Sequence, residues 1–388
     1  MMYTRLGISA AAAILTAAAS QAPPLPPPPF APVTARGGLV VVSGILPAAP
    51  AQADAATQTA QVLDALKARL EGAGTSLDRV VSTSVYLADA GDFAALNAVW
   101  ATYWPASPPA RTTVVVKLPV AGARIMVSAV AAGRGTARAV VLPKGWAPPS
   151  APLSYAVRAG DTLFLSGLVP RRGADNTLVK GDIEAQTGTV FENAEAILQA
   201  AGLTLADVVS ARVFLTDGAV FDRMNAAYRT RFPANPPARA TVITPLVSPD
   251  FLIEMTMVAV KGEGRASVVT PNADGSPGRA NPNLSSAIKV GPQVFLSGML
   301  GVLPGNALDA ASQTTETLNR LERTMTAAGT AWPDVSESIV YLTDLATAPD
   351  VLKVFAARTG GQLPAGTLVG TGLVSPEGRV EIMITAGK

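Results

Sequence analysis

The sequence predicts three tandem α+β domains, each with helices on one face of a mixed sheet. Two observations carry this prediction. The chain has 388 residues, of which 49% are hydrophobic and 15% charged, a length and composition typical of a globular protein with several domains. One set of landmarks also occurs three times in the same order, at a spacing the size of a domain.

The landmarks are an apolar strand that ends in Ser-Gly, a helix that ends in Ala-Gly, and a strand that ends in Leu-x-Asp. The three aspartates, Asp89, Asp217 and Asp344, lie 128 and 127 residues apart, which is too long a period for a solenoid. We interpret the pattern as duplication of a whole domain. The expected domains are residues 30–137, 138–264 and 265–388.

Each unit is expected to contain, in order, strand, strand, helix, strand, helix, strand and strand. The first helix is indicated by apolar positions on one helix face, in the first unit Val62, Leu63, Leu66 and Leu70. A glycine follows it, where a left-handed residue often ends a helix: Gly74, Gly202 and Gly329. The second helix is expected at residues 93–103, 221–232 and 350–358. The repeated aspartates precede it and are expected to cap it or its turn.

The last two strands of each unit carry apolar residues on both faces, as in residues 125–130. Helices can cover only one of these faces, so something else must cover the other. Another copy of the unit is the simplest cover.

Composition excludes several classes of chemistry, because the chain has no cysteine and no histidine. A Cys or His nucleophile, a Ser-His-Asp triad and nearly all zinc sites are excluded. We expect no metal and no cofactor. The net charge is only +2 and no basic block is present, so nucleic acid and anionic membranes are not expected partners.

The N-terminus has the features of an export signal. Arg5 precedes an apolar, Ala-rich stretch at residues 6–19, and small residues suited to signal peptidase follow. We expect a signal peptide at residues 1–22, a Pro-rich spacer at 23–29, and a periplasmic or secreted mature protein. An uncleaved membrane anchor is the alternative, for which the stretch is short and weakly apolar.

Arg239 and Glu254 are the most informative charged residues. Arg239 opens an apolar strand after a Pro-Pro turn, and Glu254 lies in the middle of the next apolar run. Adjacent antiparallel strands would bring the two together. A buried carboxylate is costly unless it is paired, so a plain ion pair is the structural alternative to a functional one.

Taken together, these motifs resemble the RidA/YjgF family, also known as L-PSP endoribonucleases. The resemblance covers all but the signal and spacer. It rests on the Ser-Gly strand end, the Leu-x-Asp strand, the Asp-Phe-x-x-Leu-Asn helix and the Pro-Pro-Ala-Arg turn. It implies a chorismate-mutase-like fold, a trimer around a central β-barrel, and clefts between subunits where many members hydrolyse enamines or imines. Three fused units would then form an intramolecular pseudo-trimer from one monomeric chain.

The resemblance also implies residue roles. Glu254 matches the acidic residue expected to act as base or to orient water, and the substrate-binding positions match Arg239, Ser166, Gly167, Asn225 and Arg111. The upstream family tyrosine falls at Leu153, with Tyr155 two residues on. In the first unit the acid is replaced by Met126, and in the third the arginine is replaced by Gly366. The second unit is therefore expected to hold the one principal site.

The leading hypothesis is an exported protein that binds a small carboxylate between domains and hydrolyses 2-imino or enamine acids to 2-keto acids and ammonia. Arginine suits the carboxylate because it binds it bidentately. A non-catalytic binding or scaffold protein with degenerate sites is the alternative. RNA cleavage follows only from the older family name.

Overall fold

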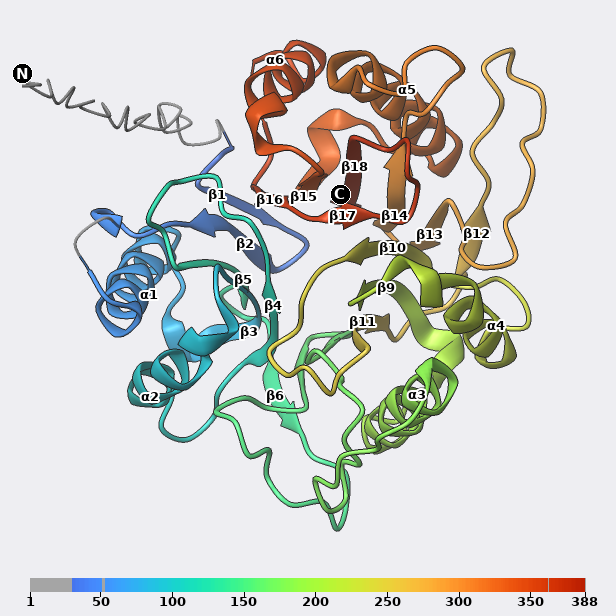
Figure 1. Cartoon of the computed structure of the whole chain (residues 1–388). Helices are drawn as coiled ribbons and strands as arrows, with labels where there is room; N and C mark the ends of the chain where they lie inside the picture. The colour runs from blue at the N-terminus through green and yellow to red at the C-terminus, as the bar shows by residue number, and fades with distance from the viewer. Residues whose placement is uncertain (1–29, 51–52, 362, 388) are drawn as a thin grey trace, which may run out of the picture.

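Three α+β units lie around a common centre in the computed structural model of the chain (Figure 1). The structure describes residues 30–50, 53–361 and 363–387. The expected signal peptide (1–22) and spacer (23–29) lie outside these residues. Among the described helices, none is both long and apolar enough to cross a membrane.

The first unit contains five strands and two helices, in the predicted order. Its elements are β1 (Val33–Arg36), β2 (Leu39–Ile45), α1 (Ala55–Gly72), η2 (Leu77–Arg79), β3 (Val80–Leu87), η3 (Ala90–Asp92), α2 (Phe93–Tyr103), β4 (Ala110–Val115) and β5 (Ile125–Ala132).

The second unit repeats this order and adds a strand at its start. Its elements are β6 (Arg138–Val141), β7 (Ala156–Ala159), β8 (Thr162–Leu165), α3 (Ile183–Ala200), η4 (Leu205–Asp207), β9 (Val208–Leu215), η5 (Gly218–Val220), α4 (Phe221–Arg231), β10 (Ala238–Ile243) and β11 (Ile253–Val260).

The third unit has the same plan. Its elements are β12 (Ala266–Val268), β13 (Ala287–Val290), β14 (Gln293–Leu300), α5 (Ala310–Ala328), η6 (Trp332–Asp334), β15 (Val335–Leu342), η7 (Leu345–Thr347), α6 (Ala348–Arg358), β16 (Gly366–Gly370), β17 (Gly372–Leu373) and β18 (Val380–Gly387).

The predicted helix ends are confirmed in all three units. Gly74, Gly202 and Gly329 have φ values of 77°, 69° and 77°, a conformation that costs glycine least. Each repeated aspartate accepts a backbone N–H bond two residues on, at the turn before the second helix. The first helices pack their apolar faces on the sheet, as α1 does through Val62, Leu66 and Leu70.

The strand order corrects one expectation. In the first unit the order is β1-β2-β5-β3-β4, with β3 and β4 parallel. The last two strands of a unit are therefore not neighbours, since the third strand lies between them. In the second unit β9 separates β10 from β11 in the same way. Arg239 and Glu254 consequently do not share a hairpin.

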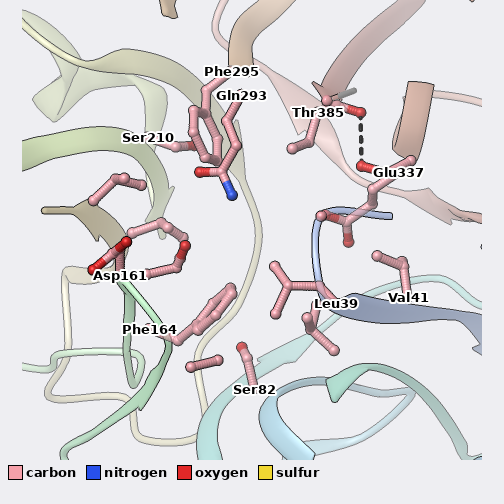
Figure 2. A pocket seen from close by; sticks show the side chains of 18 of the residues that line it. Leu39, Val41, Ser82, Asp161, Phe164, Ser210, Gln293, Phe295, Glu337 and Thr385 are labelled. Atoms are coloured by element: carbon pink, nitrogen blue, oxygen red, sulfur yellow. Dashed lines mark hydrogen bonds between the residues drawn. The ribbon is translucent and has the colours of Figure 1, made fainter. Parts of the chain in front are cut away.

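The sheet faces away from the helices meet at the centre, so each unit is covered by its neighbours as predicted. Tyr86, Phe214 and Tyr341, one from each unit, belong to one buried cluster. A cavity of about 620 Å³ adjoins them, lined by strands of all three units. Figure 2 shows Ser82, Ser210 and Glu337, again one from each unit, around this space.

The expected central barrel is not formed as a closed sheet among the described strands. Three separate sheets remain, each with open ends. They are joined at their edges: β17 of the third unit pairs with β10 of the second, and single bridges join Val114 to Leu246 and Lys117 to Gly370. These edge contacts place the last strands of one unit against the next, where the candidate sites lie.

Candidate active sites

The first site lies between the first and second units. Arg111, on β4 of the first unit, is buried, and its Nη2 donates to Asn97 Oδ1 on α2 at 2.6 Å. Its guanidinium carbon lies 5.1 Å from the centre of the Trp100 ring and 5.6 Å from that of Phe93. Arg111 Nε and Nη1 have no partner in the described chain. The guanidinium is thus fixed in place with donors to spare, although burial lowers its pKa to about 10.

Glu254, on β11 of the second unit, supplies the carboxyl group of this site. The Thr113 amide of the first unit donates to Glu254 Oε1 at 3.2 Å. Burial raises the pKa of Glu254 to about 8, and the Thr113 amide and Arg111 oppose that rise only in part. Glu254 makes no hydrogen bond to Arg111, so the two are not a closed ion pair.

Ser166 and Gly167 lie at this site and brace Arg111. Ser166 Oγ donates to the Ser154 carbonyl at 2.6 Å and accepts from the Arg111 amide at 2.9 Å. The Gly167 amide donates to the Arg111 carbonyl at 3.1 Å. The donors of both groups therefore already bind the chain. A Cβ on Gly167 would lie 1.8 Å from Glu254 Oε1, so only glycine fits there.

A cavity of about 330 Å³ connects these groups. Arg111, Thr113 and Glu254 line it from two units, together with Tyr155 and the loop that follows β8. The Tyr155 hydroxyl donates to the Gly173 carbonyl at 3.3 Å, which ties that loop to the site.

The second site repeats the first between the second and third units. Arg239 Nη2 donates to Asn225 Oδ1 at 2.7 Å, and the guanidinium carbon lies 4.6 Å from the centre of the Tyr228 ring. Arg239 Nε and Nη1 lack partners in the described chain. Asn225 was expected to bind substrate. Its side-chain oxygen accepts this hydrogen bond and positions the arginine.

Glu381 of the third unit, and not Glu254, faces Arg239. Burial raises the pKa of Glu381 to about 8, opposed by Arg239 and by the Thr241 amide. Ser297 Oγ accepts from the Arg239 amide at 2.7 Å, as Ser166 does for Arg111. The predicted pairing of Arg239 with Glu254 is thus wrong, because each arginine meets the glutamate of the following unit.

The third site, between the third and first units, has lost both charges. Ser43 Oγ still accepts from the Gly366 amide at 2.8 Å, so the backbone frame is kept. Gly366 stands at the arginine position, and the Phe30 ring would lie 2.7 Å from a Cβ there. Met126 stands at the glutamate position, with its sulfur 2.8 Å from where a Cβ on Gly44 would lie. Apolar groups fill the space where an arginine and a glutamate face each other elsewhere.

The sequence places the Met126 and Gly366 replacements in two different units. In the structure both lie at the third site, which therefore lacks both its arginine and its glutamate. The other two sites keep both charged residues. Asn97, Ser297 and Glu381 belong to these sites, and the expectation of one principal site in the second unit left them out. Within the described residues no cluster of three or more acidic side chains could hold a metal ion.

Comparison with known proteins follows the same division into units. The family model described as endoribonuclease L-PSP matches the chain three times, at residues 20–133, 145–261 and 277–388. The chain belongs to this family. The predicted resemblance to RidA/YjgF proteins is confirmed, as is its threefold repetition.

Individual relatives of the family match one unit at a time. A RutC family protein of Sulfurisphaera tokodaii is 42% identical over 114 residues, which are 29% of this chain and 91% of the relative. The 3-aminoacrylate deaminase RutC of Acinetobacter baylyi is 39% identical over 120 residues, 31% of this chain and 95% of the relative. The lengths confirm that one unit equals a whole relative.

A solved chorismatase structure matches at larger scale. It covers 80% of this chain and 93% of its own, with a TM-score of 0.53 and 16% identity, which shows likeness of fold alone. A putative endoribonuclease structure from Thermotoga maritima is 37% identical, covers 32% of this chain and 98% of its own, and has a TM-score of 0.31.

Proposed function

We propose that the protein binds small carboxylates at its first and second sites and hydrolyses 2-imino and enamine acids there to 2-keto acids and ammonia. One observation carries the proposal. At each site a buried arginine with two unpartnered nitrogens faces a glutamate whose pKa is raised to about 8. The 3-aminoacrylate deaminase among its relatives, which matches one unit, supports the same chemistry.

The proposed mechanism uses the substrate carboxylate as the anchor. Arg111 or Arg239 holds it through charge-assisted hydrogen bonds, which the unpartnered nitrogens can supply. Holding the substrate beside the glutamate carboxyl group provides much of the rate enhancement, because the reacting groups no longer have to meet by diffusion.

Glu254 or Glu381 then moves the protons. With a pKa of about 8 each is mainly neutral at pH 7 and donates its proton to the terminal carbon of an enamine, which gives the 2-iminium acid. The carboxylate so formed takes a proton from water as the water oxygen attacks C2. The carbinolamine releases ammonia and leaves the keto acid, with the glutamate protonated again. One water is consumed for each ammonia released.

Trapping of a generated imine tests the proposal. An amino-acid oxidase converts L-alanine to 2-iminopropionate, which semicarbazide captures as a semicarbazone that absorbs in the ultraviolet. We expect the purified protein to slow adduct formation, and Arg111→Ala/Arg239→Ala to abolish that effect. Arg279→Ala, an exposed arginine outside both sites, serves as the control. No slowing by the unaltered protein, with pyruvate still bound, would favour the alternative of a non-catalytic binding protein.

That alternative has one specific observation behind it, the loss of both charged residues at the third site. RNA cleavage, which the family description names, has no comparable support in a chain without histidine and with a net charge of +2.

We further propose that one chain is the complete unit and that it acts after export. Arg111 and Arg239 each find their glutamate within the same chain, so no second copy is required. Sedimentation should give a mass below the 39.5 kDa of the full sequence once the signal is removed. A mass near three times this value would contradict the single-chain proposal, and an intact N-terminus on the purified protein would contradict cleavage.

A further inference from the structure

The first and second sites share their inner residues but differ in the loop that follows the Ser-Gly strand. In the second unit this loop starts beside the first site, where Leu168 bridges to Met255 next to Glu254. In the third unit it starts beside the second site, where Leu300 pairs with Glu381. The two loops therefore border equivalent sites.

The loop at the first site brings two more cations. Arg171 and Arg172 both line the cavity of about 330 Å³ that contains Arg111. Counted from the Ser-Gly pair, the corresponding residues at the second site are Val302 and Leu303. Leu303 is 42% exposed and Leu308 on the same loop is 85% exposed, so this loop presents apolar side chains to solvent.

The cationic loop is held in place by its own contacts. Arg171 bridges to Leu178, so the loop folds back on itself. Asn193, buried on α3, donates to the Arg171 carbonyl at 2.6 Å and accepts from the Gly173 amide at 2.9 Å. The Arg171 guanidinium carbon lies 5.8 Å from the centre of the Phe251 ring. The extra cations are thus part of a built wall.

The charges that line the first site do not balance. Arg111, Arg171 and Arg172 are cations, whereas burial keeps Glu254, the one carboxyl among the described lining residues, mainly neutral at pH 7. Asp175 on the same loop interacts with Arg172 but does not line the cavity. No ion pair in the described chain involves these three arginines. A cavity of about 330 Å³ has room for roughly ten non-hydrogen atoms, at about 30 Å³ each. A ligand with a single carboxylate would not neutralise all three arginines and would not fill the cavity.

We propose that the first site takes a 2-imino or 2-keto acid with a second anionic group, which Arg171 and Arg172 recognise, and that the second site takes one with an apolar side chain. This inference rests on the proposed carboxylate binding at Arg111 and Arg239. It gives the fused chain two different substrates, which identical subunits cannot provide.

Calorimetric titration with two keto acids tests it: 2-oxoglutarate, which is dianionic and has ten non-hydrogen atoms, and 4-methyl-2-oxopentanoate, which is apolar. We expect Arg171→Ala/Arg172→Ala to weaken 2-oxoglutarate binding by about tenfold, equal to about 1.4 kcal/mol, and to leave the apolar acid unaffected. Arg111→Ala should remove the 2-oxoglutarate site, and Arg239→Ala the site for the apolar acid. Arg134→Ala/Arg279→Ala removes the same charge away from both sites and should change neither affinity.

Unchanged 2-oxoglutarate binding in Arg171→Ala/Arg172→Ala would overturn the inference, as would failure of either acid to bind the unaltered protein. Failure of the catalytic proposal looks different. In that case both keto acids bind with the expected dependence, but 2-iminoglutarate and the imine of leucine, generated by amino-acid oxidases, are not consumed faster.

Discussion

The guanidinium groups of Arg111 and Arg239 are buried, and neither forms an ion pair among the residues that the structure describes, which is a costly state for a charge. An asparagine and aromatic rings meet part of the cost at each site. The remaining unpartnered nitrogens are what a carboxylate ligand would satisfy. At the scale of single residues, binding of a carboxylate would therefore relieve an unfavourable burial at each site.

Gly167→Ala should displace Glu254, because the added Cβ would lie 1.8 Å from its Oε1. We expect a loss of about 1–3 kcal/mol in the free energy of unfolding and loss of activity at the first site alone. Urea denaturation and the imine assay measure the two effects. Gly188→Ala is the matched control, since it lies in α3 with nothing within 4 Å of the new Cβ. Equal behaviour of the two variants would show that Glu254 does not require the space.

The raised pKa values of Glu254 and Glu381 predict a pH dependence of stability. Between the ordinary value of 4.5 and about 8 the folded state holds protons that the unfolded state has released. The free energy of unfolding should therefore fall as pH rises through this window, by at most about 1.4 kcal/mol per pH unit for each carboxyl. Glu254→Gln/Glu381→Gln should flatten the curve measured by denaturation. Parallel curves for the two proteins would contradict the pKa shifts.

At the scale of elements, each site joins strands of two units. At the first site the edge strand β4 brings Arg111 to the seam, and β11, inside the next sheet, brings Glu254. At the second site β10, which the short β17 of the third unit flanks, brings Arg239, and β18 brings Glu381. The Ser-Gly pairs, directly after β8 and at the register shift within β14, hold the neighbouring backbone in place through the serine hydroxyl. The seam is thus fixed by hydrogen bonds that do not depend on the charges, which explains why the third site keeps its frame after losing them.

Met126→Glu tests this account of the third site. The new carboxyl would be buried at the seam without the arginine that Gly366 replaces, so we expect a loss of about 2–5 kcal/mol in stability. Leu142→Glu, at a position that is 47% exposed, should cost little. Thermal and urea denaturation of both variants decide the matter. An equally small cost for Met126→Glu would mean that the third site still accepts a carboxyl group.

At the scale of the whole molecule, fusion of three units allows unlike residues at equivalent places around the centre. Arg212 donates to Ser84 at 3.0 Å, and these two occupy equivalent strand positions with Ile339. Ser82, Ser210 and Glu337 form a second such set. In three identical chains an arginine at this position would meet two others. Here burial raises the pKa of Glu337, and the charge of Arg212 opposes that rise in part.

Reversal of the charge at Glu337 tests whether the centre requires unlike residues. Glu337→Arg places a second cation in the central cavity and should lower the melting temperature more than Glu337→Gln does, because like charges repel in a poorly solvated space. Arg212→Gln added to Glu337→Arg should recover most of the loss. Equal melting temperatures for Glu337→Arg and Glu337→Gln would show that charges in the cavity are screened as strongly as charges in bulk water.

Most of each unit could be predicted from the sequence, because helix periodicity, the Ala-Gly helix ends and the capping aspartates are local features. The site could be predicted only in part. The sequence singles out Arg239, Glu254 and Arg111 from their family positions, but it pairs Arg239 with Glu254, whereas in the structure Arg239 faces Glu381. The error came from treating consecutive strands as neighbours, whereas β9 enters between β10 and β11.

The sequence by itself determined the three units, their family and the residue types that remain at each family position. Only the tertiary structure decided which arginine meets which glutamate. The physical reason is that strand pairing and the seams between units join residues far apart in the chain, as the contact of Thr113 with Glu254 does. When the arginine and glutamate positions are paired within each unit, only the second unit has both residues. When they are paired across the seams, as in the structure, two sites have both residues and the third has neither.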